Sequence, residues 1–174
     1  MKKTIYILLV ILSLFSLTAC TSKGEVETVE DDAPPMLKKV TEGIKKVELD
    51  DEGNIVIDEN DITNKATYFD YIFENVHIGL LAVRNSDGKV IVVVNTCQSC
   101  GGSPYAYFVQ IDDKIQCQNC GNLFAIDDLD KLSKGGCNPI EIEERTDKDG
   151  KIIIGTEQLN KLKDKFENWK GPKA

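Results

Sequence analysis

Histidine is nearly absent from this chain of 174 residues, in which His77 is the single example. A Rieske-type cluster takes two histidine ligands and most zinc hydrolase sites take several, so the chain by itself can build neither. The sequence also lacks a phosphate-binding glycine loop, a GxGxxG motif and a Ser/His/Asp arrangement. These absences argue against a hydrolase and against a nucleotide-binding enzyme.

Positive charge is also scarce, since 21 lysines and arginines face 29 aspartates and glutamates, which gives a formal net charge of -8. Nucleic acid is therefore not an expected partner, because little of the surface could neutralise phosphates. Hydrophobic residues make up 41% of the chain, which suits a modest core but not a multi-span membrane protein. The length fits one domain with short extensions.

No apolar run at the N-terminus is long enough to cross a bilayer. Residues 5–19 form an apolar run after two lysines, whereas a membrane span needs about 20 residues. This pattern is typical of a secretory signal peptide, which we place at residues 1–19. The run ends at Leu17-Thr18-Ala19-Cys20, which resembles a bacterial lipobox. The resemblance implies a lipid on Cys20 and a lipid-anchored protein on the extracytoplasmic face of the cell membrane, with ordinary secretion as the alternative.

Residues 20–36 differ in composition from the remainder of the chain. After Cys20 they contain five acidic residues and two prolines but almost no large apolar side chains. Such a segment cannot bury enough surface to order itself. We interpret it as an acidic linker between a lipidated Cys20 and a β-rich metal-binding domain at residues 37–174.

The domain sequence predicts short strands separated by tight turns. Apolar residues alternate with polar ones on both sides of the turn at residues 51–54. The segment Asn85-Ser86-Asp87-Gly88 lies between two apolar runs and is a strong hairpin signal. Further strands are expected at residues 66–73, 78–83, 90–94, 105–111, 114–116 and 152–154.

A helix is expected at the C-terminal end. Thr156 would cap it, and Gly171-Pro172 would end it. Four apolar residues would lie along one face of this helix, namely Leu159, Leu162, Phe166 and Trp169. The expected fold class is therefore mainly β with a C-terminal helix (β+α).

Five cysteines follow Cys20, and four of them form two CxxC pairs. The pairs are Cys97/Cys100 and Cys117/Cys120, with sixteen residues between them. Two thiolates separated by two residues can bind one cation from a tight turn. Two such pairs at this spacing are typical of a four-thiolate metal site. The predicted cofactor-binding residues are therefore these four cysteines.

Each pair also follows a predicted strand and precedes a glycine, Gly101 or Gly121. Glycine tolerates the left-handed backbone that lets such a turn curl and aim its amides at sulfur. The pattern therefore predicts two metal-binding knuckles on neighbouring β-hairpins, as in rubredoxin-like sites and zinc ribbons.

The fifth cysteine, Cys137, follows two glycines in the run Gly135-Gly136-Cys137-Asn138-Pro139. Tight backbone here would bring its thiol near another group. Spacing leaves open whether Cys137 is a ligand, a replacement ligand or a spare thiol, and we include it among the candidate metal ligands. His77 lies away from the cysteines in the sequence and is not expected to be one.

Thiolate ligands suit an iron–sulfur cluster, mononuclear iron or Zn²⁺, and the spacing does not choose among them. Covalent haem attachment is excluded because neither CxxC is followed by histidine. Disulfides are an alternative outside the cytoplasm, although five thiols cannot all pair within one chain. The open functions are an iron protein, a zinc-stabilised binding module and an extracytoplasmic thiol/disulfide oxidoreductase. Whether the chain is an enzyme stays open, with non-enzymatic metal binding favoured.

Several motifs occur in order between Tyr68 and Ile140: Ser86-Asp87-Gly88-Lys89, the two CxxC pairs, Phe124-Ala125-Ile126-Asp127 and the Gly-Gly-Cys-Asn-Pro run. In this order they resemble the FtrD-like family of membrane iron–sulfur proteins, which have β-rich extracytoplasmic domains. The resemblance implies iron or an iron–sulfur cluster, and a role in iron transport or electron transfer beside a membrane transporter or redox partner. Many family members carry several membrane spans, so this chain would be a tethered accessory. The ligands that the resemblance implies are Cys97, Cys100, Cys117 and Cys120, with Cys137 as the fifth candidate.

Overall fold

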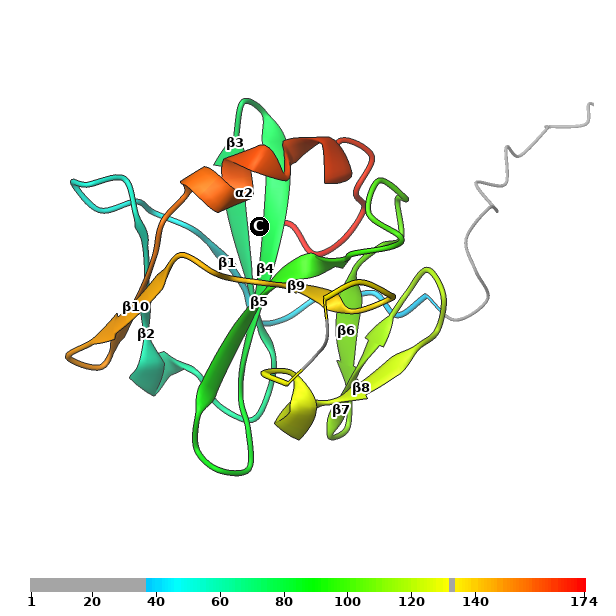
Figure 1. Ribbon diagram of the computed structural model, residues 1–174, viewed down its shortest axis with the longest axis horizontal. Helices are drawn as coiled ribbons and strands as arrows, with labels where there is room; N and C mark the ends of the chain where they lie inside the picture. Colours follow the sequence, from blue (N-terminus) through cyan, green and yellow to red (C-terminus); the bar gives the residue numbers. More distant parts are fainter. Residues whose placement is uncertain (1–36, 132–133) are drawn as a thin grey trace, which may run out of the picture. The chain divides into compact units, whose positions relative to one another are not determined.

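The computed structural model describes residues 37–131 and 134–174. The predicted signal peptide at 1–19, the predicted lipidation site Cys20 and the acidic linker at 20–36 lie outside these residues. Among the residues that are described, no helix combines the length and the apolar character needed to span a bilayer. The fold is mainly β with one short C-terminal helix, as predicted (Figure 1).

The largest sheet has five strands in the order β1-β3-β4-β5-β9. Antiparallel β4 and β5 form its centre, while β1 joins β3 in parallel at one edge and β9 joins β5 at the other. The predicted turn links β4 to β5, and there the Asn85 side chain accepts a 2.8 Å hydrogen bond from the Lys89 amide. The strands are β1 (Ile44–Lys46), β3 (Thr67–Phe73), β4 (Val76–Arg84), β5 (Val90–Cys97) and β9 (Pro139–Glu141).

Two three-stranded antiparallel sheets lie on opposite sides of this sheet in Figure 1. One has the order β10-β11-β2 and contains β10 (Arg145–Lys148), β11 (Lys151–Ile154) and β2 (Ile55–Asp58). The other has the order β6-β7-β8 and contains β6 (Phe108–Ile111), β7 (Lys114–Cys117) and β8 (Leu123–Ala125). Two single 3₁₀ turns, η1 (Glu59–Asp61) and η2 (Ile126–Asp128), follow β2 and β8.

Strand β5 separates two hydrophobic cores. Its residues are buried without exception, and because side chains alternate along a strand they divide between the two faces. Val90, Val92 and Val94 belong to the first core, which also holds Trp169 and Phe166. Ile91, Val93 and Cys97 belong to the second core, which also holds Cys117 and Phe108. The cysteines therefore gather in the second core, away from the C-terminal aromatic residues.

The C-terminal helix is shorter than predicted. It consists of α2 (Glu157–Lys161) followed by the 3₁₀ turn η3 (Lys163–Lys165). Thr156 occupies the N-cap position as predicted, and its carbonyl accepts a 2.9 Å hydrogen bond from the Asn160 amide. Its side chain makes no cap hydrogen bond, because its hydroxyl donates to the Gly53 carbonyl at 3.3 Å instead. The apolar face is buried as expected, and three of its residues form part of the first core: Leu159, Phe166 and Trp169.

Candidate metal centre

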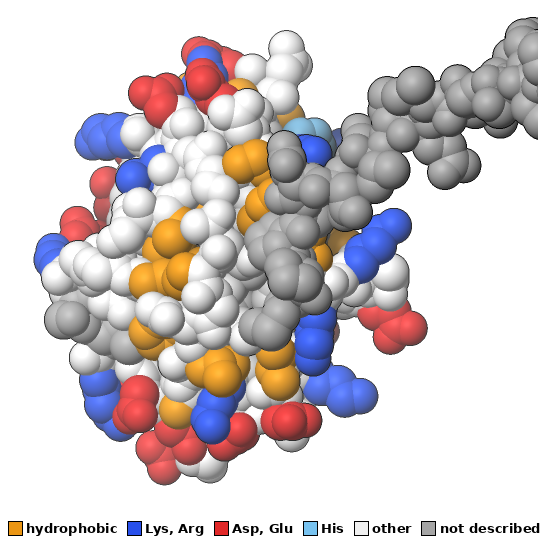
Figure 2. Space-filling view, turned by 90° about the vertical axis from the view of Figure 1, so that its right-hand side faces the viewer, with side chains coloured by type: hydrophobic (Ala, Val, Ile, Leu, Met, Phe, Trp, Pro, Cys, Tyr) orange, Lys and Arg blue, Asp and Glu red, His pale blue; other side chains and the backbone are white. Residues whose placement is uncertain are grey.

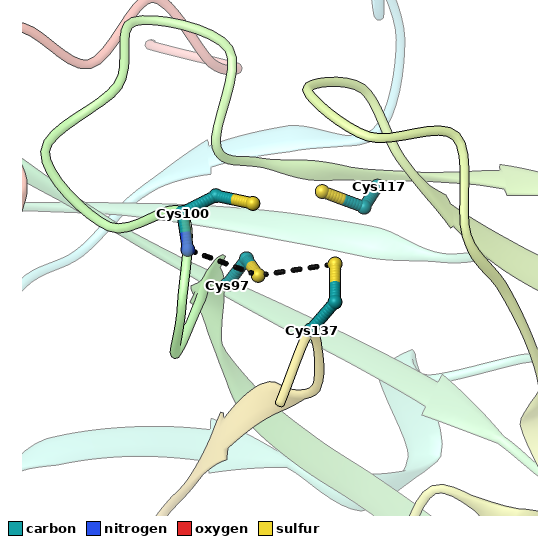
Figure 3. Close-up of side chains that lie close together, drawn as sticks. All are labelled: Cys97, Cys100, Cys117 and Cys137. Carbon is teal, nitrogen blue, oxygen red and sulfur yellow. Dashed lines mark hydrogen bonds between the residues drawn. The ribbon is translucent and has the colours of Figure 1, made fainter. Parts of the chain in front are cut away.

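Four cysteines from three segments of the chain lie close together in the fold. Cys97 ends β5 and Cys100 lies in the turn that follows, whereas Cys117 ends β7. Cys137 lies in the loop before β9. Figure 3 shows the four sulfur atoms pointing toward a common centre. Residues separated by up to 40 positions are thus brought together by the pairing of β5 with β9 and by the packing of β7.

The sulfur atoms of Cys97, Cys100, Cys117 and Cys137 all lie within 4.8 Å of one another. The Cys97 and Cys137 sulfurs are 3.2 Å apart, and the Cys100 amide donates to the Cys97 sulfur at 3.3 Å. The described cysteines form no disulfides. Tetrahedral zinc–thiolate sites place neighbouring sulfurs about 3.8 Å apart, so these sulfurs could hold one metal ion with small side-chain shifts.

Burial divides the five thiols into three classes. Cys97 and Cys117 are completely buried, Cys100 and Cys137 are half-buried, and Cys120 is exposed. Cys120 lies outside the group of four, although its thiol interacts with those of Cys137, Cys117 and Cys100. The structure therefore brings three of the four paired cysteines together with Cys137, and it leaves Cys120 at the edge of the cluster.

Hydrogen bonds join the first CxxC turn to the loop of Cys137. The Gln98 amide donates to the Asn138 carbonyl at 2.8 Å, and the Gln98 side chain accepts from the Gly135 amide at 2.7 Å. The Ser99 hydroxyl donates to the Gly136 carbonyl at 2.6 Å. Gly135 and Gly136 both have positive φ, a conformation that glycine adopts at little cost. Sequence reasoning missed the part played by Gln98, because its partners lie about 40 residues away.

Glycine shapes the two CxxC turns differently. In the second turn Gly121 has a φ of 78°, as the sequence predicted, but its amide donates to the Cys117 carbonyl at 2.8 Å and not to sulfur. In the first turn the glycine with positive φ is Gly102, at 100°, and not Gly101. A Cβ at Gly101 would lie 3.1 Å from the Cys97 carbonyl oxygen, so this glycine allows close packing instead. The rubredoxin-like form of the two turns stays a prediction.

The thiols are perturbed in opposite directions. Burial raises the pKa of Cys117 to about 12, despite amide donors from Cys120 and Asn119. Burial likewise raises the pKa of Cys100 and Cys137. Partial burial opposes ionisation of Cys120, but hydrogen bonds, the strongest from Cys137, outweigh it and lower its pKa. The raised pKa values favour the protonated thiols of Cys100, Cys117 and Cys137, so a bound metal would have to displace their protons.

Charged side chains are absent from the cysteine-bearing segments. Residues 90–111, 115–126 and 135–140 contain no Asp, Glu, Lys or Arg, although 29% of the chain is charged. On the face shown in Figure 2, hydrophobic and uncharged groups fill much of the middle and many charged side chains lie toward the edges. Few charges close to sulfur help a thiolate-bound metal to keep its ligands and control its potential. One charge does reach this region from another segment, because the Lys165 ammonium donates to the Gln98 carbonyl of the first CxxC turn at 3.4 Å.

Two buried polar atoms beside Cys97 have no partner in the described residues, Asn95 Nδ2 and Thr96 Oγ1. The other end of the Asn95 side chain accepts a 2.8 Å hydrogen bond from the Phe108 amide. Phe108 lies opposite Cys117 in the pairing of β6 with β7. The Asn95 side chain therefore links β5, which carries Cys97, to β6, which pairs with the strand that carries Cys117. An unsatisfied donor there fits a site that gains sulfur acceptors when a metal group binds.

His77 lies elsewhere in the fold. Its Nδ1 is 2.9 Å from both carboxylate oxygens of the buried Asp70. Among the described residues, the group of possible metal ligands contains cysteines alone. The four sulfurs thus form a soft donor set that fits iron, an iron–sulfur cluster or Zn²⁺.

A comparison with protein families agrees with this donor set. Residues 62–166 match a family model described as "Membrane iron-sulfur containing protein FtrD-like". The matched segment covers more than half of the chain and includes all five cysteines of the domain. Neither the curated proteins nor the solved structures gave a significant match.

Proposed function

The chain belongs to the FtrD-like family of membrane iron–sulfur proteins, and from this premise we propose that it carries iron or an iron–sulfur cluster on cysteine thiolates at the extracytoplasmic face of the membrane. Its role would be electron transfer, or assistance to a membrane transporter of iron. The observation that carries the proposal is the group of four cysteine sulfurs within 4.8 Å of one another. No hydrolytic or group-transfer step is needed for either role.

The inner ligands in this proposal are Cys97, Cys100, Cys117 and Cys137, and Cys120 is the nearest thiol outside them. The two buried cysteines fix the group on its inner side, since their strands are paired within sheets. The two half-buried cysteines complete it from loops that the Gln98 hydrogen bonds hold together. Cys120 is placed to replace an outer ligand, because it is exposed and interacts with Cys137.

When bound, an iron–sulfur group supplies a one-electron redox couple whose potential depends on net charge, hydrogen bonds to sulfur and exposure to water. The residues around the cysteines influence all three of these properties. Its cysteine segments are uncharged, the Asn95 amide offers a buried donor, and half-buried Cys100 and Cys137 leave one side near the solvent. The partner would approach on that side.

Anaerobic purification of the full-length protein tests the proposal. We expect a coloured protein containing iron, and we expect Cys97→Ser and Cys117→Ser to abolish both colour and iron. Ser86→Ala, a change in the β4–β5 turn that removes no sulfur but only a hydroxyl that donates to Asp127, should keep them. Cys120→Ser should retain most of the iron, whereas Cys137→Ser should not. Full iron content in the Cys97→Ser and Cys117→Ser proteins would refute the site.

A zinc-stabilised binding module is the second candidate. Four sulfurs from three segments, with no fifth described ligand within the group, match the closed four-thiolate sites in which zinc holds loops together. The same purification separates the two, because zinc–thiolate protein is colourless and iron–thiolate protein is not. Stoichiometric zinc with no iron in anaerobic protein would favour this alternative.

The lipid anchor is proposed separately from the metal. Growth with labelled fatty acid should label the wild-type protein and not Cys20→Ser. Unlabelled wild-type protein recovered from the medium would favour ordinary secretion instead, and it would leave the metal proposal standing.

A further inference from the structure

A surface pocket of about 290 Å³ lies where residues 39–44 meet the C-terminal segment. Four residues give it an apolar lining, and Gly171 and three lysines form the rest, with no acidic side chain among the described residues that line it. The apolar lining consists of Val40, Ile44, Tyr107 and Pro172, and the lysines are Lys39, Lys170 and Lys173.

Lys38 adds a fourth positive charge next to this pocket. We call Lys38, Lys39, Lys170 and Lys173 the basic patch. All four are exposed, and the ion pairs found among the described residues involve none of them. Such a concentration of unpaired positive charge is notable in a chain with a net charge of -8.

Backbone hydrogen bonds hold the two ends of the basic patch on the fold. The Lys38 amide donates to the Gln118 side chain at 2.8 Å, and the Lys170 amide donates to the Pro104 carbonyl at 2.8 Å. The Ala174 amide donates to the buried Asp70 carboxylate at 2.9 Å. These hydrogen bonds hold the backbone that carries the lysines, so the lysines keep their positions relative to one another.

We propose that the basic patch docks the domain on an anionic lipid surface. Phospholipid headgroups supply the negative charge that four lysines attract, and the apolar lining of the pocket gives their alkyl stems a surface to lie on. The inference rests on the membrane association of the family and not on the identity of the metal.

The position of the basic patch in the chain favours a membrane over an acidic protein. Lys38 is the second described residue, so the patch begins where the acidic linker that follows Cys20 joins the domain. The 16 residues between Cys20 and Leu37 can span at most about 55 Å, which keeps an anchored domain close to the lipid.

Docking through the basic patch would also orient the cysteine cluster. The Gln118 side chain that holds Lys38 belongs to the second CxxC turn, and the Gln118 amide donates to the Tyr107 carbonyl at 2.8 Å. Tyr107 in turn lines the pocket. The basic patch is thus directly linked to the second CxxC turn. A domain docked through the patch would hold its cysteine cluster close to partner proteins embedded in the same membrane.

Lysine acylation of the full-length protein, reconstituted in vesicles and read by mass spectrometry, tests this docking. Phosphatidylcholine vesicles are compared with vesicles that also contain phosphatidylglycerol. We expect the anionic lipid to slow acylation of the four patch lysines by at least about fivefold. The effect should vanish near 1 M salt, where the Debye length falls to about 3 Å. Lys148 and Lys151, on the β10–β11 hairpin on the other side of the molecule (Figure 1), serve as internal controls.

Charge reversal provides the matched comparison. One variant changes the four patch lysines to glutamate, and the control variant changes Lys65, Lys114, Lys148 and Lys151, which are also exposed and outside the ion pairs found. Hydrogen exchange of residues 37–46 and 170–174 is read in both kinds of vesicle. Slower exchange with phosphatidylglycerol should be lost in the patch variant and kept in the control.

Equal acylation of the patch lysines in the two kinds of vesicle would overturn the proposal. Equal slowing at Lys148 and Lys151 would also overturn it, because the attraction would then be non-specific. Protection by polyglutamate but not by phosphatidylglycerol would assign the basic patch to an acidic protein instead. Iron content measured on the same samples keeps this outcome separate from any failure of the metal proposal.

Discussion

The two hydrophobic cores, one on each face of β5, differ in the side chains that fill them. The first is closed by aromatic packing, in which Trp169 meets Phe166 and Tyr107 at centroid distances of 5.3 and 6.2 Å. The second contains the cysteine thiols beside its aliphatic side chains. Each core also has a buried polar atom with no hydrogen-bond partner among the described residues, Trp169 Nε1 in the first and Asn95 Nδ2 beside Phe108 of the second. The first core thus stabilises the fold by aromatic packing, whereas the second contains the candidate metal ligands.

The largest effect is expected from breaking the first core. Trp169→Ala removes a side chain that is 1% exposed and should destabilise the protein by about 3–5 kcal/mol, measured by urea unfolding. Gly79→Ala should also destabilise it, because the new Cβ would lie 2.3 Å from Trp169 Cη2. In the Trp169→Ala background the Gly79 substitution should cost little. Additive effects would show that the ring and Gly79 are not in contact.

Removing the metal should break the second core and spare the first. In the metal-free protein, we expect faster hydrogen exchange in the cysteine-bearing turns and in the loop of Cys137, because protonated thiols no longer hold these loops together. Exchange in β2 and β11 should be unchanged, since their pairing involves no cysteine and their buried side chains belong to the first core. The measurement is exchange mass spectrometry before and after chelation. Global unfolding on chelation would mean that the two cores are not independent.

Sequence reasoning succeeded where a feature depends on neighbours along the chain. The turn at residues 85–88 formed as predicted because its hydrogen bonds run between residues three or four apart. Thr156 occupies the N-cap position as predicted, but its hydroxyl makes no cap hydrogen bond because it donates to a carbonyl 103 residues away. The place of Cys137 in the cluster depends on hydrogen bonds between Gln98 and the Gly135 loop, 37 residues apart. Spacing alone therefore identified the thiolate chemistry but could not rank Cys137 above Cys120.

Substitutions of the two buried polar residues beside Cys97 should have smaller effects on the free energy of unfolding, and the two effects should differ. Asn95→Leu leaves the Phe108 amide buried without its acceptor and should cost about 1–3 kcal/mol in the metal-free protein. Thr96→Val keeps the shape of a side chain whose hydroxyl has no hydrogen-bond partner among the described residues, and it should be neutral or stabilising. Urea unfolding of the two variants measures both effects. A larger cost for Thr96→Val would indicate a partner for its hydroxyl.

The smallest effect concerns the surface contact between the β4–β5 turn and η2. The Ser86 amide and hydroxyl donate to the Asp127 carboxylate at 2.9 and 2.7 Å, and these bonds lower the pKa of Asp127 below its ordinary value of 3.8. A lowered pKa stabilises the fold above pH 3.8, and this stabilisation is lost as the pH falls through the folded value. Ser86→Ala should therefore lower Tm by about 1–2 °C at neutral pH, with the difference shrinking in acid. Ser99→Ala, which removes a hydroxyl bond to the Gly136 carbonyl, should show no such pH dependence because no carboxylate takes part. Parallel melting curves of the two variants across the acid range would contradict the role given to Asp127.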